Sequence, residues 1–229
     1  MINSKPYRVV PGPEGLLPPA AATCGVVLPE KGEGLVLGSL QSEQDTLLVM
    51  ARELLTRKNP TIFPGPLVLW AWKEGVAEKA ASVLELADEI PGVRIIPMPD
   101  YRPIYPKIDP EAVINPCHPN LTIWHNKIEV CVFVGVHCHF ANITLKMIRA
   151  GTNCYTITLC HEAGHEDSMA SLPFCGSDQV RALTEAIRQL KREGLRPRYA
   201  DTPGIQLTPT QQTVLSGLAW QHGDGALAE

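Results

Sequence analysis

Two short apolar runs on either side of an amphipathic segment constrain the fold of this chain more than any other feature. The first run reads Glu129-Val-Cys-Val-Phe-Val-Gly-Val, the second reads Cys154-Tyr-Thr-Ile-Thr-Leu-Cys160, and residues 140–150 between them have helical character. A connection of this length suits two parallel strands joined by a helix. Residues 129–165 therefore predict a strand–helix–strand unit.

Polar side chains gather where each of these two strands is expected to stop. His137, Cys138 and His139 follow the first strand, and Cys160 and His161 follow the second. In open parallel sheets, ligands bind beyond the carboxyl ends of the strands. We therefore expect these five residues to face one crevice although they are far apart in sequence.

Apolar runs and helical stripes alternate along most of the remaining chain. Residues 34–39, 66–72 and 93–98 are expected to be strands, and residues 75–90 and 177–193 are expected to be helices, with Ser42 capping a further helix after the first strand. Near-continuous apolar runs are typical of strands that are covered on both faces. The alternation predicts an α/β fold with a doubly wound, mostly parallel sheet.

The two ends and one internal stretch lack this alternation. Residues 1–32 are rich in Pro, Gly and Ala and predict an extended N-terminal arm, residues 33–194 the α/β domain, and residues 195–229 a C-terminal tail. Residues 97–127 are rich in proline and show no clear periodicity. Such a stretch inside a domain is usually functional or an interaction surface.

Charge, hydropathy and cysteine usage argue against several classes of protein. A net charge of −4 and a pI near 6.0 argue against a nucleic-acid partner. No apolar run reaches the roughly 18 residues that span a bilayer, and no signal-peptide core is evident at the start. Seven cysteines at scattered spacings indicate reduced thiols rather than a disulfide framework. We expect a cytoplasmic protein with no membrane partner.

The sequence His161-Glu162-Ala163-Gly164-His165 matches the H-E-x-x-H pattern of zinc peptidases. That chemistry needs a helix, because histidines four residues apart share one helical face and can then bind zinc. Here the five residues directly follow an expected strand and include a glycine, and no apolar helical pattern continues beyond them. We therefore expect His161 and His165 not to share a helical face.

The Cys/His group itself allows two interpretations. No C-x-x-C pair is present, which disfavours a closed zinc site or an iron–sulfur cluster, so a polar lining for a small molecule or partner is favoured over bound metal. Gly38-Ser39 and Gly135 stand at strand ends where the backbone could approach a phosphate, although neither a G-x-G-x-x-G nor a Walker pattern is present. Tight turns are the favoured explanation for these glycines.

The helix expected to open near residues 140–142 would point its N-terminal N–H groups at the same hollow and favour an anionic ligand. The expected lining of the main pocket or partner contact is Gly38, Ser39, Gly135, His137, Cys138, His139, Asn142, Cys160 and His161. The alternative is that these side chains are buried and mutually satisfied, with no ligand.

Three segments together resemble a known family. They are the run from Glu129 to His137, the helical Ala141-Asn142-Ile-Thr-Leu-Lys-Met-Ile148, and Thr156-Ile-Thr-Leu-Cys160. They are similar to the epsilon subunit of the archaeal acetyl-CoA decarbonylase/synthase complex, also called the carbon monoxide dehydrogenase beta subunit family. The resemblance spans roughly residues 33–193, and the glycine turn after residues 35–37 suits the family's first strand.

The resemblance implies a flavodoxin-like or Rossmann-like domain of the NAD/FAD-binding type. It further implies an accessory, non-catalytic subunit of an anaerobic carbon monoxide dehydrogenase/acetyl-CoA synthase-type redox complex, which helps to pass electrons to FAD. The expected partner is the catalytic nickel–iron–sulfur dehydrogenase subunit, FAD is the candidate cofactor, and self-association of the chain is left open. The dense Cys/His group, the N-terminal arm and the tail depart from the family.

Two alternatives remain open at this point. The first is a metal-dependent hydrolase or metal-binding protein that uses the Cys/His group. The second is a detached central domain of a thiamine-diphosphate or nucleotide-dependent enzyme.

Overall fold

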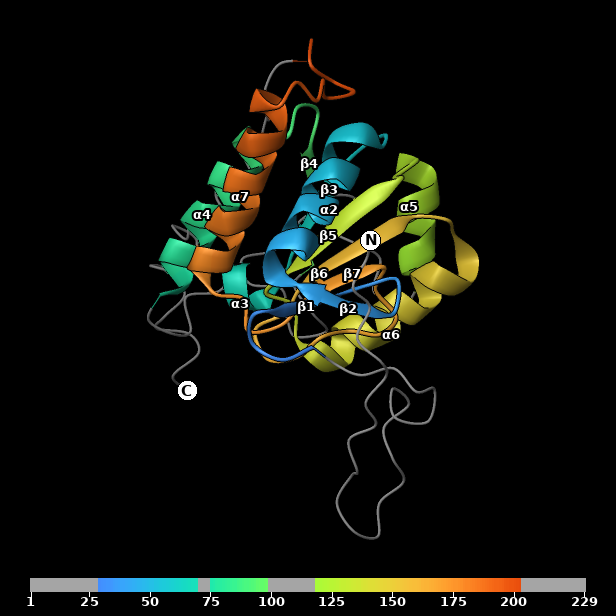
Figure 1. Ribbon diagram of the computed structural model, residues 1–229. Coiled ribbons are helices and arrows are strands. Elements are labelled where there is room, and N and C mark those ends of the chain that lie inside the picture. Colours follow the sequence, from blue (N-terminus) through green and yellow to red (C-terminus); the bar gives the residue numbers. More distant parts are fainter. Residues whose placement is uncertain (1–28, 70–74, 99–117, 203–229) are drawn as a thin grey trace, which may run out of the picture.

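The computed structural model describes residues 29–69, 75–98 and 118–202, and these residues form one seven-stranded sheet with helices on both faces (Figure 1). The strands are β1 (Glu33–Val36), β2 (Ser39–Ser42), β3 (Thr61–Pro64), β4 (Arg94–Ile95), β5 (Val130–Val134), β6 (Tyr155–Leu159) and β7 (Ala170–Leu172). The helices are α2 (Glu43–Thr56), α3 (Pro66–Leu69), α4 (Val76–Asp88), α5 (Pro119–Asn126), α6 (Cys138–Gly151) and α7 (Ser177–Arg192). The α/β class is confirmed.

The sheet is mostly parallel, in the order β2-β1-β7-β6-β5-β3-β4. The pairs β4–β3, β3–β5, β5–β6 and β6–β7 are parallel, and the strand–helix–strand unit β5–α6–β6 is present as expected. Strand β5 lies between β3 and β6, and its five residues are all buried. A central position covered on both faces explains why this strand is apolar throughout.

Two hydrophobic cores fill the spaces between the sheet and its helices. Along β5, Val130, Val132 and Val134 belong to the core beneath α2, α4 and α7, whereas Cys131 and Phe133 belong to the core beneath α5 and α6. This assignment follows the period of two along a strand. Figure 1 shows α4 and α7 packed side by side on one face and α5 and α6 on the other. The assignment as a Rossmann-like, NAD/FAD-binding domain stays a prediction.

The first expected strand, residues 34–39, is wrong in its extent and its pairing. The structure instead has a β-hairpin in which β1 pairs antiparallel with both β2 and β7. The hairpin turn consists of Leu37 and Gly38, with positive φ angles of 48° and 79°. Positive φ at both turn residues is the geometry of a type I′ hairpin, which usually carries Asn-Gly. Because leucine is rare at such a position, the sequence did not indicate this turn.

The second expected strand, residues 66–72, is also misplaced over residues 66–69, and residues 70–72 lie outside the described residues. Strand β3 ends at Pro64, and the helical turn α3 begins at Pro66. A proline at the first helical position is favourable, because its missing N–H has no intrahelical partner there. The backbone N–H of Gly65 donates to the carbonyl of Val134, and the N–H of Leu67 donates to the carbonyl of Gly135. The apolar residues 67–69 therefore cover the end of β5 rather than forming a strand.

Other expectations for the chain have mixed outcomes. Ser42 caps α2, since its hydroxyl accepts a hydrogen bond from the backbone N–H of Asp45 at 3.1 Å. Helices α4 and α7 fall within the ranges expected from their apolar stripes. The short elements β7 and α5 were not expected from the sequence. Most of the N-terminal arm, residues 99–117 of the proline-rich stretch and most of the C-terminal tail lie outside the described residues.

Candidate functional site

The carboxyl ends of β5 and β6 lie side by side, as the sequence predicted. The two strands pair in parallel with Val134 opposite Leu159, so the residues after each strand emerge at one edge of the sheet. A cavity of about 180 Å³ opens there, lined by Leu67, Val136, His137, Cys138, Cys160, His161 and Glu162. Four of the expected site residues, two histidines and two cysteines, therefore meet at one hollow.

Gly38 and Ser39 do not belong to this edge of the sheet. The backbone N–H of Leu37, just before Gly38, donates to the carbonyl of Met169, which precedes β7. Because β7 runs parallel to β6, this turn lies at the amino end of the parallel strands, opposite the cavity. The expectation that Gly38 and Ser39 share a crevice with the ends of β5 and β6 required a parallel first strand. The first strand, β1, is antiparallel, so this expectation is wrong.

Gly135 contributes a close backbone contact rather than a surface for a ligand. Its φ angle is +65°, and a Cβ atom built there would lie 2.5 Å from Cγ2 of Val68. Gly65 faces the same place, since its Cβ would lie 2.5 Å from the carbonyl oxygen of Gly135. The two glycines let α3 pack directly onto the end of β5, where it forms one wall of the cavity.

A close pair of thiols lies at the floor of the cavity. The Sγ atoms of Cys138, at the start of α6, and Cys160, just after β6, are 3.4 Å apart. The backbone N–H groups of Glu162 and Ala163 both donate to the Cys160 sulfur at 3.4 Å. A carboxylate oxygen of Glu162 lies 3.7 Å from the Cys138 sulfur. Cys160 is buried and Cys138 is half-buried, so the pair is reached from the cavity.

His165 completes this cluster and was not expected in it. A ring nitrogen of His165 and the sulfurs of Cys138 and Cys160 lie within 4.8 Å of one another. The side chain is only 3% exposed. Its Nδ1 atom lies 2.6 Å from Oδ1 of Asn142, whereas Nε2 is buried and has no hydrogen-bond partner. A buried polar atom left without a partner costs about 1–3 kcal/mol, so this nitrogen requires an explanation.

The remaining expected residues surround the cluster rather than form it. Asn142 holds His165 and does not line the cavity. The rings of His137 and His139 stack with centroids 5.8 Å apart at the start of α6. His139 and His161 are exposed, and His137 is half-buried. His137 and His161 line the hollow, and His139 lies beside it, stacked on His137; these three residues are called the histidine rim.

The two thiols differ strongly in acidity. Burial raises the pKa of Cys160, but the nearby His165 ring and hydrogen bonds from the backbone N–H groups of Ala163 and Glu162 outweigh burial and lower it to about 7. His165 lowers the pKa of Cys160 because its ring lies close to the sulfur, although its Nε2 atom has no hydrogen-bond partner. Burial and the adjacent Cys160 raise the pKa of Cys138 to about 12. Near neutral pH the pair alone therefore carries no more than one negative charge.

The H-E-x-x-H segment is not helical, as expected. Residues 161–165 form an irregular loop after β6, in which His161 is exposed and His165 is buried. The two histidines therefore do not share a helical face, and the zinc-peptidase geometry is absent. The pattern nevertheless includes His165, which belongs to the cluster. Its place there depends on the path of the loop from β6 to β7, which the sequence does not reveal.

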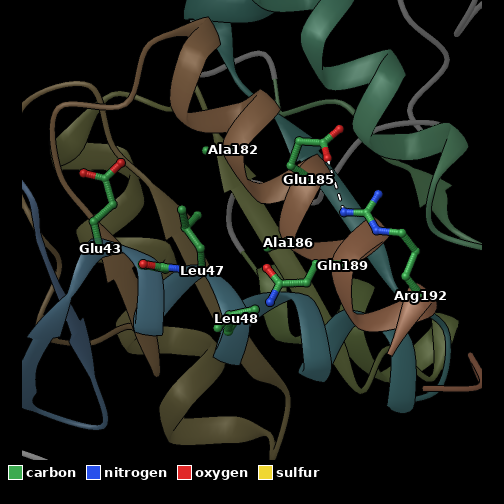
Figure 2. Close-up of a pocket in the computed structure, with 9 residues that line it drawn as sticks. Glu43, Leu47, Leu48, Ala182, Glu185, Ala186, Gln189 and Arg192 are labelled. Atoms are coloured by element: carbon green, nitrogen blue, oxygen red, sulfur yellow. Dashed lines mark ion pairs between the residues drawn. The ribbon is translucent and has the colours of Figure 1, made fainter. Parts of the chain in front are cut away.

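A second, wider hollow lies between α2 and α7 and has a different character. It measures about 420 Å³ and is lined by Glu43, Gln44, Leu47, Leu48, Ala182, Glu185, Ala186, Gln189 and Arg192 (Figure 2). Figure 2 shows Arg192 directed toward Glu185, an ion pair of 3.8 Å on α7 itself. The lining contains no cysteine or histidine and none of the expected site residues.

No helix among the described residues is long and apolar enough to cross a membrane.

No curated protein and no solved structure matches the chain. Residues 28–187 match the sequence profile of the family described as CO dehydrogenase beta subunit/acetyl-CoA synthase epsilon subunit. The matched range runs from just before β1 into α7, contains the whole Cys/His cluster, and covers well over half of the chain. The chain therefore belongs to the CO dehydrogenase beta subunit/acetyl-CoA synthase epsilon subunit family.

Proposed function

We propose that this chain is an accessory, non-catalytic subunit of a carbon monoxide dehydrogenase/acetyl-CoA synthase-type redox complex. The observation that carries the proposal is the family match over residues 28–187. The family's name associates its members with CO dehydrogenase and acetyl-CoA synthase.

The catalytic subunit docks on the edge of the sheet that carries the histidine rim. Phe174 follows β7 at this edge, beside Cys175, whose backbone N–H donates to the carbonyl of Cys160. The Phe174 side chain is 49% exposed. Exposed aromatic side chains are enriched among the residues that dominate binding energy at protein interfaces. Phe174 and the rim residues His139 and His161 therefore form the centre of the proposed contact.

The start of α6 supports a flavin as the second part of the proposal. This 14-residue helix begins at the cavity, because Cys138 is both its first residue and part of the cavity lining, and the first backbone N–H groups of a helix point outward from its N-terminal end. Such groups favour an anion such as the pyrophosphate of FAD. The cavity is too small for a whole flavin, so the partner subunit would cover the remainder of the cofactor.

The direct test measures binding of the full chain to the purified catalytic dehydrogenase subunit of the same organism under anaerobic conditions. We expect a stable complex that Phe174→Ala weakens at least tenfold, which corresponds to about 1.4 kcal/mol. Leu37→Ala is the matched control, because Leu37 is also a large apolar residue at positive φ, is 69% exposed, and lies at the opposite edge of the sheet. We expect it to bind as the wild type does.

A functional assay follows CO-dependent reduction of FAD by the catalytic subunit with and without this chain. We expect faster FAD reduction when the chain is present and none from the chain alone. Absence of binding to the catalytic subunit would refute the proposed function. Binding without any effect on FAD reduction would retain the accessory role and remove the flavin.

A further inference from the structure

We propose that Cys138, Cys160 and His165 bind a single zinc ion. This inference goes beyond the accessory role and does not depend on it, because the three ligands all come from this chain. The residues converge from two separate elements, the start of α6 and the loop between β6 and β7. The site uses the floor of the cavity, beneath the histidine rim.

The spacing of the sulfurs matches a shared metal ion better than a covalent bond. Two thiolates that each lie roughly 2.3 Å from one tetrahedral ion are about 3.8 Å apart. The observed separation of 3.4 Å is close to that value, and a small movement would admit the ion. A disulfide would instead require the sulfurs to approach to about 2.05 Å. The third ligand, a ring nitrogen of His165, is already within 4.8 Å of both sulfurs.

The orientation of His165 is an independent observation that indicates a metal. Its Nδ1–H donates to Oδ1 of Asn142 at 2.6 Å, which leaves Nε2 as the nitrogen with a free lone pair. That atom is buried and has no partner among the described residues. Histidines that bind metals commonly donate their other ring N–H to a fixed oxygen in this way. The loop also fixes the backbone, because the His165 N–H donates to the Ser171 hydroxyl at 2.8 Å.

Charge and donor type identify the class of ion. Two thiolates and one dication form a neutral cluster, which a buried site tolerates far better than an uncompensated charge. Two sulfurs and one imidazole are donors typical of zinc rather than of magnesium or calcium. The fourth position faces the cavity, where Glu162 lies 3.7 Å from the Cys138 sulfur. A water molecule from the cavity completes the tetrahedron, which keeps the cluster neutral.

The experiment measures zinc in the full chain, purified under reducing and anaerobic conditions. Elemental analysis is expected to find one zinc ion per chain, and a cobalt-substituted sample is expected to show thiolate-to-cobalt charge-transfer absorption. Cys160→Ser and His165→Ala are each expected to lower the zinc affinity at least about 100-fold, measured by competition with a chromogenic chelator. Asn142→Ala removes only the group that orients His165, so a loss of about 10–100-fold is expected.

The chain contains a matched control for these variants. Cys131 and Cys154 form another close thiol pair, with sulfurs 3.7 Å apart, but both are buried in the core beneath α5 and α6. Cys154→Ser is therefore expected to keep the full zinc content. If Cys160→Ser does not fold, Cys138→Ser at the half-buried position carries the test. Wild-type protein with no more zinc than Cys138→Ser, or with a Cys138–Cys160 disulfide in non-reducing mass spectrometry, would overturn the proposal.

Discussion

Nδ1 of His165 lies 2.6 Å from Oδ1 of Asn142, and this contact joins the loop after β6 to helix α6. Because an amide oxygen only accepts hydrogen bonds, the contact requires a proton on Nδ1. One side-chain contact therefore leaves Nε2, which is buried and has no hydrogen-bond partner, as the unprotonated nitrogen of this histidine. The chemistry of the candidate site depends on that choice of tautomer.

The first prediction concerns this tautomer in metal-free protein. Nitrogen-15 NMR of the histidine side chains is expected to show His165 as the Nδ1–H form. Asn142→Ala is expected to lower the free energy of unfolding by about 1–3 kcal/mol, because it leaves a buried donor unsatisfied. Ile143→Ala is the control, since Ile143 is an exposed neighbour on the same helix. Finding the Nε2–H form in the wild type would contradict the assignment.

The second prediction concerns Gly135, the glycine that directly follows β5. Gly135→Ala combines a left-handed backbone, at about 1–2 kcal/mol, with overlap onto Val68, at about 1–3 kcal/mol. We expect these two contributions to add to a loss of about 2–5 kcal/mol in chemical denaturation. Gly194→Ala separates the two effects, because Gly194 has φ +93° and nothing within 4 Å of an added Cβ. That control is expected to lose only about 1 kcal/mol, and equal losses for both variants would refute the role of the Val68 contact.

The strongest periodic signals in the sequence predicted the middle of the fold correctly. The β5–α6–β6 unit has a fully buried central strand next to a strand of the same kind, so apolar composition and helical periodicity were sufficient there. The hairpin of β1 and β2 was missed because Leu37 occupies a turn position that leucine rarely adopts. The three-residue strand β7 is too short to produce a recognisable alternation.

The same contrast applies to the candidate site. Topology placed Cys138 beside Cys160, since parallel neighbouring strands deliver the residues that follow them to one edge. The predicted topology could not locate His165, because the position of that ring depends on an irregular loop and on a contact with Asn142. The prediction for Gly38 was wrong, because β1 is antiparallel to β7 and its turn therefore lies at the opposite edge of the sheet.

The third prediction concerns pH and an ion-pair network between α4 and α7. Burial alone would raise the pKa of Glu89, but hydrogen bonds and charge from Lys191 and Arg188 outweigh it and lower the pKa. The distances are 2.7 Å to Nζ of Lys191 and 2.8 Å to Nε of Arg188. A carboxyl whose folded-state pKa is depressed stabilises the protein above its unfolded value of 4.5, and this stability is lost as pH falls through the folded pKa.

Glu89→Gln is therefore expected to lower the free energy of unfolding by about 1 kcal/mol at pH 7, since the network is partly exposed. The difference from wild type is expected to shrink below about pH 4.5 in urea titrations. Glu85→Gln is the control, because Glu85 makes only a 3.7 Å ion pair with Arg181 and is half-exposed. A difference between Glu89→Gln and wild type that is constant from pH 7 to pH 3 would refute the assigned role.

The last prediction separates what Phe174 does for folding from what it does for binding. Its φ angle is +54°, a conformation that costs a residue with a Cβ about 1–2 kcal/mol, and its exposed ring gains little from burial. Phe174→Gly removes this strain, while the greater freedom of glycine in the unfolded chain costs about 0.4–1 kcal/mol. The strain is the larger effect, so the variant is expected to be more stable by roughly 0.5 kcal/mol.

Leu37→Gly is the control, and with φ +48° at Leu37 it is expected to show a similar gain in stability in thermal unfolding. Only Phe174→Gly is expected to weaken binding to the catalytic subunit, and equal binding by both variants would remove Phe174 from the contact.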